Sequence, residues 1–452
     1  MLASSSILAR RLGVNASVTA VRSLSSSSAT SAASPSLSSE VLMAMEYEHG
    51  AHNYHPIPVV FSRAQGANVW DPEGKHYYDF LSAYSAVNQG HCHPKIVKAL
   101  VEQASQCTLS SRAFYNDKLP QFAKRVTEMF GYDMVLPMNT GAEAVETGLK
   151  IARKWGHMKK GIKEGRGAVV SAKGCFHGRT LAAVSLSDDP ECRKGFGPFV
   201  PNIHHVAYND VEALERIFEK HHEDISCFIV EPIQGEGGVI VPQKDYLSKC
   251  HALCKKYNIL LIADEIQTGL CRTGRVLAQE WDGARADITL LGKALSGGTY
   301  PVSCALADRE VMTCIHPGEH GSTYGGNPIA AAVGIASLEV LVEERLAERA
   351  DELGQKLRSD LTGLNIPFVK EVRGRGLLNA IEIDPSYKHS AWAVCQVLKD
   401  RGLLAKPTRD TVIRLAPPLV MSDEDMAKCT DIISSTLKDI DNIDPSKLDQ
   451  GH

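Results

Sequence analysis

The chain has 452 residues, which at roughly 150 residues per domain is enough for about three domains or subdomains. Apolar residues make up 44% of it and charged residues 23%, which are ordinary globular proportions and exclude a chain disordered throughout, a collagen-like repeat and a small disulfide-bonded scaffold. Asp and Glu total 53 against 49 Lys and Arg, and such a mildly acidic chain does not favour nucleic-acid binding, which needs a basic face.

The first 39 residues have a composition of their own. They hold fourteen Ser and three Arg and no acidic residue, which is typical of a transit peptide. The pair Arg10 and Arg11 interrupts the compact apolar core that a secretory signal needs. We therefore expect residues 1–39 to be a disordered transit peptide for the mitochondrial matrix. A plastid address stays open, and so does a cytoplasmic protein whose tail carries no address.

Strands and helices are expected to alternate along most of the remaining chain. Residues 41–87, with a turn at 71–74, are expected to add an edge to one of the two domains described below. The expected strands that follow are 168–171, 227–231, 259–264, 288–291 and 302–307, and the expected helices between them are 142–155, 211–220 and 246–257. Short, nearly all-apolar strands that alternate with helices indicate βαβ units around a buried, mostly parallel sheet. No apolar run reaches the ~18 residues of a membrane span, so we expect no transmembrane helix.

The last third of the chain is expected to form a smaller α/β domain. A long helical stretch follows Pro328 toward Gly363, and after it we expect a strand at 377–383, a helix at 391–402, a strand at 412–415 and a helix from Ser422. The chain is thus expected to divide into a transit peptide (1–39), an N-terminal segment that packs with the small domain (40–87), a large domain (88–330) and a small C-terminal domain (331–452).

Cys and His residues give no strong sign of a metal site. The twelve Cys are scattered, and Cys250 and Cys254 have no second pair nearby to complete a zinc site. His91 and His93 flank Cys92, but Pro94 follows them at an expected helix start. We expect mostly buried thiols in a reducing compartment, and no metal.

Two expected strands end in groups that carry chemistry. Strand 259–264 ends in Asp264, and Lys293 follows strand 288–291 and precedes a Gly-rich turn. The chain lacks a G-x-x-x-x-G-K-[ST] loop and a G-x-G-x-x-G turn after a strand, so we expect neither a P-loop nucleotide nor a dinucleotide. Ligands of open α/β sheets lie at the carboxyl ends of strands, where a partly desolvated Lys loses its proton and forms an imine. An acid and an amine at one sheet edge fit pyridoxal 5′-phosphate, since Lys293 would hold its aldehyde and Asp264 would keep its pyridine nitrogen protonated.

Two further stretches fit a phosphate group. Thr140 can cap the helix that Gly141 and Ala142 open, and the free N–H groups of a first helical turn bind phosphate. Residues 320–328 form a loop of small and hydroxyl-bearing residues. Taken singly, these are also the patterns of an ordinary capped helix and an ordinary loop.

Together these stretches resemble the class III pyridoxal-phosphate aminotransferases, which share the type I fold of pyridoxal-phosphate enzymes with aspartate aminotransferase. Within that class the chain is most similar to the ornithine aminotransferase family. The segments that carry this similarity are 47–56, 84–94, 231–236, 263–269 and 402–407. The resemblance covers about residues 41–440. It implies transfer of the δ-amino group of L-ornithine to 2-oxoglutarate, which gives L-glutamate 5-semialdehyde and L-glutamate and serves proline and glutamate metabolism and arginine breakdown.

The resemblance also implies roles for residues around the cofactor. Lys293 would form the Schiff base and then move the proton between carbon atoms, and Asp264 would pair with the pyridinium nitrogen. Thr323 would reach the phosphate of the neighbouring subunit, which implies a homodimer or higher homo-oligomer with shared active sites. The other expected cofactor contacts are Gly141, Ala142, Phe176, Glu231 and Gln267.

The substrate residues follow from the same resemblance. When the δ-amine reacts, the α-carboxylate of ornithine lies far from the cofactor, where Arg179 and Tyr54 would bind it and Tyr84 would line the pocket. 2-Oxoglutarate has two carboxylates and must place its α-carbon at the cofactor ring, which needs a second arginine, and Arg414 would be that arginine. Glu236 would pair with Arg414 in the first half-reaction and release it in the second.

Two other functions stay open. The first is another ω-aminotransferase, acting on acetylornithine or 4-aminobutyrate, although such an enzyme would not obviously need Tyr54 and Tyr84 together. The second is a non-catalytic binding protein on the same fold, against which the presence of both Lys293 and Asp264 argues. Small molecules are the expected ligands, with neither a nucleic acid nor a membrane as partner.

Overall fold

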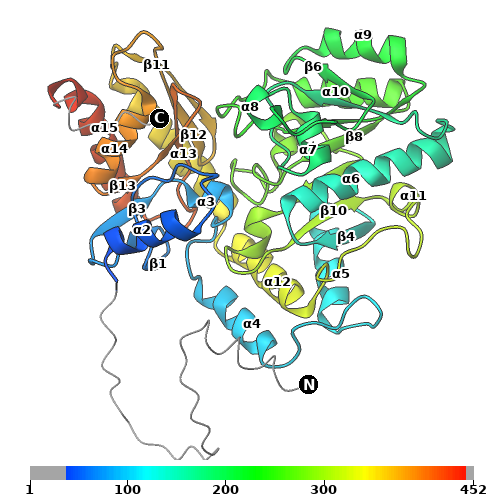
Figure 1. The fold of residues 1–452 in the computed structure, drawn as a ribbon, viewed down its shortest axis with the longest axis horizontal. Helices are drawn as coiled ribbons and strands as arrows, with labels where there is room; N and C mark the ends of the chain where they lie inside the picture. The colour runs from blue at the N-terminus through cyan, green and yellow to red at the C-terminus, as the bar shows by residue number, and fades with distance from the viewer. Residues whose placement is uncertain (1–36, 444–452) are drawn as a thin grey trace, which may run out of the picture. The chain divides into compact units, whose positions relative to one another are not determined.

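The computed structural model describes residues 37–443, and the expected transit peptide lies almost wholly outside these described residues (Figure 1). The largest sheet has seven strands in the order β4-β10-β9-β8-β7-β5-β6. Its strands are β4 (Met134–Met138), β5 (Ala168–Ala172), β6 (Ile203–Val206), β7 (Ile225–Val230), β8 (Leu260–Asp264), β9 (Ile288–Leu291) and β10 (Ser303–Ala307). All neighbouring pairs are parallel except those of β10, which is antiparallel to both β4 and β9. The predicted mostly parallel sheet is therefore confirmed.

Helices cover both faces of this sheet. Leu260 and Ile262 of β8 pack into a cluster with residues of α6, whereas Leu261 and Ala263 pack into a second cluster with residues of α9 and α10. Because successive side chains of a strand point to opposite faces, β8 is buried from both sides, which explains its continuous apolar sequence. The helices of this part are α4 (Pro94–Ala104), α5 (Lys118–Phe130), α6 (Gly141–Trp155), α7 (Leu181–Leu186), α8 (Pro190–Arg193), α9 (Val211–His221), α10 (Tyr246–Lys256) and α11 (Arg309–Met312), with the short turns η1 (Gly156–Lys160), η2 (Ala278–Asp282) and η3 (Lys293–Ser296).

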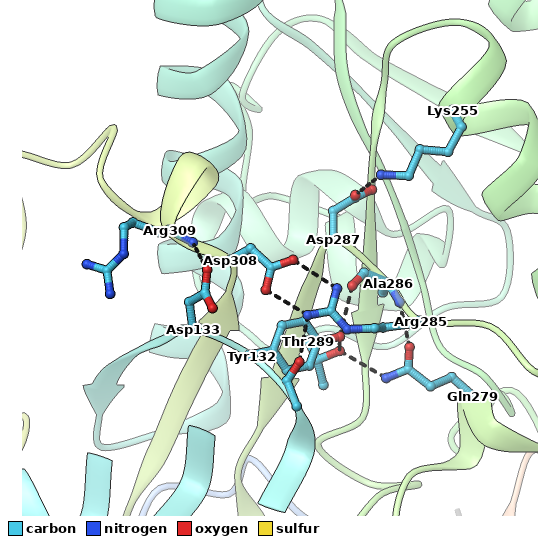
Figure 2. A network of polar contacts seen from close by, with 11 residues as sticks. Tyr132, Asp133, Lys255, Gln279, Arg285, Ala286, Asp287, Thr289, Asp308 and Arg309 are labelled. Carbon is cyan, nitrogen blue, oxygen red and sulfur yellow. Dashed lines mark hydrogen bonds and ion pairs between the residues drawn. The ribbon is translucent and has the colours of Figure 1, made fainter. Parts of the chain in front are cut away.

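A polar network stabilises the end of the sheet at which β9 begins (Figure 2). Arg285 donates to both carboxylate oxygens of Asp308, at 2.7 and 3.0 Å, and the Tyr132 hydroxyl donates to the Ala286 carbonyl at 2.8 Å. These residues join the loop before β9 to the end of β10, which is antiparallel to it. Since Lys293 follows the other end of β9, this network is structural and lies away from the predicted site.

The C-terminal part has its own antiparallel sheet, in the order β11-β12-β15-β14. Its elements are α12 (Pro328–Glu343), α13 (Leu346–Gly363), β11 (Val369–Arg375), β12 (Leu378–Ile383), α14 (Ala391–Asp400), β14 (Lys406–Thr408), β15 (Val412–Leu415), α15 (Asp423–Asp439) and η4 (Ile440–Asn442). The long helical stretch predicted from Pro328 toward Gly363 is present. It is two helices, because Arg345 between them has φ +51° and so leaves the right-handed conformation.

The N-terminal described segment adds a small sheet that is joined to the C-terminal part through β13, and it extends neither of the two sheets above. After α2 (Ser39–His49), the strands β1 (Arg63–Gln65), β2 (Asn68–Trp70) and β3 (His76–Asp79) form a separate sheet with β13 (Leu403–Leu404). The predicted turn is present, since Gly74 has φ +85° and donates to the Asp71 carbonyl at 3.0 Å. The parallel pairing of β3 with β13 connects this segment with the C-terminal part, while the four-part division of the chain stays a prediction.

Two features of composition can be compared with the described residues. Most of the twelve Cys are buried and none forms a disulfide, as predicted. Among residues 37–443, no helix has the length and apolar character that crossing a membrane requires.

Candidate active site

A cavity of about 190 Å³ lies where the carboxyl ends of β7, β8 and β9 meet the first turn of α6. It brings together all the predicted cofactor residues except Thr323. The residues that line it are Gly141, Ala142, Phe176, His177, Gly178, Glu231, Asp264, Ile266, Gln267 and Lys293. A larger hollow of about 790 Å³ lies at the opposite end of α6 and contains none of the predicted residues. The lysines and the arginine of this larger hollow stabilise the negative, C-terminal end of the helix dipole of α6, so their presence there needs no ligand to explain it. We therefore place the site in the smaller cavity.

Lys293 is held on a strained backbone directly after β9. Its φ is +42°, a conformation that costs free energy for any residue with a β carbon. The carbonyl of the next residue, Ala294, accepts hydrogen bonds from Gln89 Nε2 at 3.0 Å and Ser337 Oγ at 2.8 Å, which fix this turn. Burial lowers the pKa of the Lys293 amine, an effect that Glu236 opposes and Arg414 strengthens. A lowered pKa increases the fraction of neutral, nucleophilic amine.

Asp264 is fixed by a partner that the sequence did not reveal. His177 Nδ1 lies 2.7 Å from Asp264 Oδ2, and the side chains of both residues are buried. Burial opposes a charge on the ring, but Cys175 and the bond to Asp264 hold the pKa of His177 well above its ordinary value. The Ile266 N–H donates to the other Asp264 oxygen at 3.1 Å. The only sequence signal for His177 is its place beside Phe176 in a predicted ring-stacking segment.

Glu231 ends β7 and joins two loops of the cavity. One of its oxygens accepts from the Phe176 N–H at 2.9 Å and the other accepts from the Gly235 N–H at 3.1 Å. Only 4% of the residue is exposed, and this burial raises the pKa of Glu231 to about 7. Taken alone it would be a solvated acid at a strand end, whereas here it helps to shape the cavity.

The first turn of α6 is closed by a capping box. The Glu143 N–H donates to Thr140 Oγ1 at 3.2 Å, and the Thr140 N–H donates to Glu143 Oε2 at 2.7 Å. A Cβ atom at Gly141 would lie 3.1 Å from an Ile266 methyl group, so the small residue lets the backbone approach the cavity. The N-terminus of a 15-residue helix, open to a cavity through Gly141 and Ala142, is suited to bind a phosphate.

An ion pair between a buried arginine and a partly buried glutamate lies beside this cavity. Arg414 Nη1 donates to Glu236 Oε1 at 2.9 Å, and 1% of the Arg414 side chain and 31% of the Glu236 side chain are exposed. Burial raises the pKa of Glu236, but Arg414 outweighs this and holds it below the ordinary value. The Arg414 guanidinium lies 5.2 Å from the ring centre of Tyr84, whose pKa is raised by burial and by Glu236. Within residues 37–443, Nε and Nη2 of Arg414 are buried without an acceptor.

Besides Tyr84, Glu236 and Arg414, three other predicted residues lie outside the cavity. Tyr54 is 71% exposed, although it is close enough to Tyr84 to help raise the pKa of that phenol. Arg179 is exposed, 2.8 Å from Cys192 Sγ and 5.3 Å from the Phe176 ring centre, so it is near the cavity entrance. Thr323 is exposed on the loop before α12 and is not part of this cavity.

Comparison with known proteins agrees with this geometry. The profile of the class III aminotransferases matches residues 49–437. The chain belongs to this family. It is 59% identical over 408 residues to the ornithine aminotransferase of Emericella nidulans, covering 88% of this chain and 90% of the relative, and 56% identical to the mitochondrial ornithine aminotransferase of Arabidopsis thaliana, covering 91% and 88%.

Solved structures give the same fold. An ornithine aminotransferase from Toxoplasma gondii, with partial occupancy of pyridoxal phosphate at its active site, has a TM-score of 0.88 at 46% identity and covers 90% of this chain and 95% of that one. An acetylornithine aminotransferase from Elizabethkingia anophelis has a TM-score of 0.82 at 49% identity and covers 89% and 100%.

The cofactor of class III aminotransferases is pyridoxal 5′-phosphate, and the residues present fit it. Gln267 Oε1 is buried and has no hydrogen-bond partner among the described residues, as expected for a group that faces a ligand. The cavity also has the amine of Lys293, the carboxylate of Asp264 and the open helix terminus at Gly141. An aldehyde, a pyridine nitrogen and a phosphate would each meet a matching group.

Proposed function

We propose that this protein is an ornithine δ-aminotransferase, which converts L-ornithine and 2-oxoglutarate to L-glutamate 5-semialdehyde and L-glutamate. The observation that carries the proposal is the ion pair of the buried Arg414 with the partly buried Glu236 beside Tyr84. An arginine next to the cofactor would attract the α-carboxylate of ornithine and bring the wrong amine to react, and a carboxylate partner prevents this. The ornithine aminotransferases among the relatives, at 52–59% identity, support the same substrate.

The residues of the cavity divide the work of holding the cofactor. Pyridoxal phosphate, when bound, supplies an aldehyde for the amino group and a ring that withdraws electrons from the reacting carbon. Lys293 Nζ would bind the aldehyde carbon, and once the substrate amine has displaced it, the neutral amine would carry the proton between carbon atoms. Asp264 would hold the proton on the ring nitrogen while His177 keeps the carboxylate in place. The N–H groups of Gly141 and Ala142 would bind the phosphate.

The remaining cofactor contacts are side chains with a clear geometric basis. The Phe176 ring lines the cavity and would cover one face of the cofactor ring, and Glu231 fixes the Phe176 backbone beneath it. Gln267 would use its unpartnered Oε1 toward the ring hydroxyl. Together these groups would limit the access of water to the face at which Lys293 would move its proton.

The substrates would use opposite sides of the pocket. With the δ-amine of ornithine at Lys293, the α-carboxylate reaches toward the entrance, where Arg179 and Tyr54 would bind it and Tyr84 would line its path. In the second half-reaction the two carboxylates of 2-oxoglutarate need a second cation. The unpartnered Nε and Nη2 of Arg414 would supply the missing donors once Glu236 gives way. The two substrates would therefore bind in alternation, as in a ping-pong reaction.

A homodimer with shared active sites completes this proposal. The 11-residue helix α2 has no buried side chain, and isolated helices shorter than ~12–15 residues are marginally stable in water. A second copy that covers α2 would give it a packing partner, and the exposed Thr323 of that copy would reach the phosphate. Light scattering should give the mass of a dimer or larger oligomer, and Thr323→Ala should weaken cofactor binding without changing that mass.

The location is proposed from the first 39 residues. Their Arg- and Ser-rich composition without acids is that of a mitochondrial transit peptide, and the Arabidopsis thaliana and Rattus norvegicus relatives are named mitochondrial. In the matrix the semialdehyde product would cyclise and feed proline and glutamate metabolism and arginine breakdown. Residues 1–39 fused to a fluorescent protein should direct it to mitochondria, and substitution of Arg10 and Arg11 by Gln should abolish import.

A half-reaction tests the activity directly. The purified holoenzyme is mixed with L-ornithine without a keto acid, the cofactor absorption band is followed, and the product is trapped with o-aminobenzaldehyde. Loss of the band together with a coloured pyrroline adduct is expected. An unchanged band with ornithine but conversion with acetylornithine or 4-aminobutyrate would move the substrate to that of another ω-aminotransferase. The absence of any cofactor band would leave a binding protein.

A further inference from the structure

Lys406 lies directly beside Arg414 in the small sheet. Strands β14 and β15 pair antiparallel, and their register sets Lys406 opposite Arg414. Residues directly opposite in an antiparallel pair put their side chains on the same face, about 5 Å apart at Cβ. Two cations therefore share one face of the sheet.

That face packs against the segment that carries Glu236. Val412, two residues from Arg414 and thus on the same face, packs in one apolar cluster with Ile233 and Val239. Ala380, the partner of Arg414 on β12, belongs to the same cluster. Glu236 lies between Ile233 and Val239 in the chain, so its carboxylate approaches the sheet from the side on which both cations lie.

Lys406 is a cation with free bonding capacity. Within the described residues its Nζ makes one hydrogen bond, to the His55 carbonyl, and this bond is long at 3.5 Å. An ammonium group has three donors, so Lys406 can take another acceptor without losing a strong partner. Burial lowers the pKa of Lys406, an effect that Glu236 opposes and Arg414 strengthens, in keeping with the shared face of the sheet. His55 also follows Tyr54, so Lys406 borders the side of the pocket where that residue lies.

Release of Arg414 creates a need that Lys406 can meet. When a substrate carboxylate takes the donors of Arg414, Glu236 must give way, and a carboxylate that is only 31% exposed is costly without a partner. We propose that Lys406 is a specificity-determining residue that holds the Glu236 carboxylate while Arg414 binds the keto acid. This inference rests on the proposed function and adds the group that makes the Glu236–Arg414 exchange reversible.

The test compares the two half-reactions of Lys406→Met holoenzyme by rapid mixing. The efficiency of the 2-oxoglutarate half-reaction should fall about tenfold, the size of one charged hydrogen bond, while that of the ornithine half-reaction stays within about twofold. Lys406→Arg should restore the lost efficiency. Lys370→Met is the matched control, because Lys370 pairs with Glu382 at 2.7 Å in the same sheet away from the site, and neither half-reaction should change. Equal losses in both half-reactions of Lys406→Met, or none, would overturn the proposal.

Binding of glutarate gives a readout apart from turnover. Calorimetry should show that this unreactive dicarboxylate binds Lys406→Met about tenfold more weakly than the wild-type protein. In the Glu236→Gln variant, the further substitution Lys406→Met should leave glutarate binding unchanged, because no displaced carboxylate then needs a partner. A double variant that stays as weak as Lys406→Met would show direct contact of Lys406 with the ligand and refute the proposal. If the wild-type protein did not convert ornithine, the proposed function would fail, while the glutarate comparison would still decide the role of Lys406.

Discussion

The substitution Glu236→Gln tests the proposed basis of substrate choice most directly. Glutamine keeps the shape of the side chain but removes the charge that faces Arg414 at 2.9 Å. Arg414, only 1% exposed, would then lack an anionic partner until a substrate provides one. We therefore expect tighter binding of 2-oxoglutarate and poorer discrimination between the two amino groups of ornithine.

The size of the effect follows from the geometry. A hydrogen bond between charged groups contributes about 1.5–3 kcal/mol, and the lower end applies here because Glu236 is about one third exposed. About 1.4 kcal/mol corresponds to tenfold in an equilibrium constant. The dissociation constant of 2-oxoglutarate should thus fall about tenfold, and the preference for the δ-amine of ornithine should decrease by a similar factor.

The assay separates the two products of ornithine in a single half-reaction. Both products cyclise to pyrrolines, the δ-product with its carboxylate on a saturated carbon and the α-product with its carboxylate on the imine carbon. Chromatography of the unreduced mixture against the two authentic pyrrolines distinguishes them. Glu382→Gln is the control, because Glu382 pairs with Arg373 and Lys370 in the same small sheet. Unchanged affinity for 2-oxoglutarate together with an exclusive δ-product would refute the proposed role of the ion pair.

Three further predictions concern the cavity. A Cβ at Gly235 would lie 1.9 Å from Gln267 Oε1 and would displace that side chain. Gly235→Ala should therefore slow transamination as much as Gln267→Ala does, and the double variant should be no slower than either. Additive losses in kcat/KM would contradict this. His177→Phe should weaken cofactor binding about tenfold or more in equilibrium dialysis, since it removes the donor 2.7 Å from Asp264, and unchanged affinity would exclude a positioning role. Burial raises the pKa of Glu231 from 4.5 to about 7, so the native state binds this proton more tightly than the unfolded state does. The resulting contribution to the free energy of unfolding is lost as the pH rises from 4.5 to 7. In urea unfolding of the cofactor-free protein, Glu231→Gln should reduce this loss of stability with pH.

Sequence patterns predicted five of the seven strands of the central sheet, β5 and β7 to β10, because these five are buried on both faces. The two edge strands, β4 and β6, are only partly buried and were missed. A strand such as β8 reads as a short continuous apolar run, and its end marks the edge where ligands bind, which led to both Asp264 and Lys293. The missed strands lack this signal. Strand β11 contains four charged residues in seven and β13 has only two residues, so their pairing depends on partners distant in sequence.

The candidate site could be predicted only in part. Nothing local marks His177 as a partner of Asp264, since the two are 87 residues apart and their contact arises from the parallel pairing of the sheet. The sequence also does not predict the burial of Arg414, because a four-residue strand with one arginine is expected to have one exposed face. The roles of Glu236 and Arg414 came from the family resemblance, and the structure adds that they are in contact and that Lys406 lies opposite Arg414.

The segments that carry Tyr84 and Lys293 show why local propensity fails at this site. All four residues of the element α3 (Ser82–Ser85) have φ between +46° and +72°, and Lys293 has φ +42°. Left-handed backbone costs roughly 1–2 kcal/mol for each residue other than glycine, so neither segment would adopt this shape alone. Buried contacts must outweigh the cost, and Gln89, four residues beyond α3, supplies one of them through its bond to the Ala294 carbonyl. The same side chain thus ties the turn of Tyr84 to the turn of Lys293, and strain that the local sequence disfavours is kept at the two places where substrate and cofactor would meet.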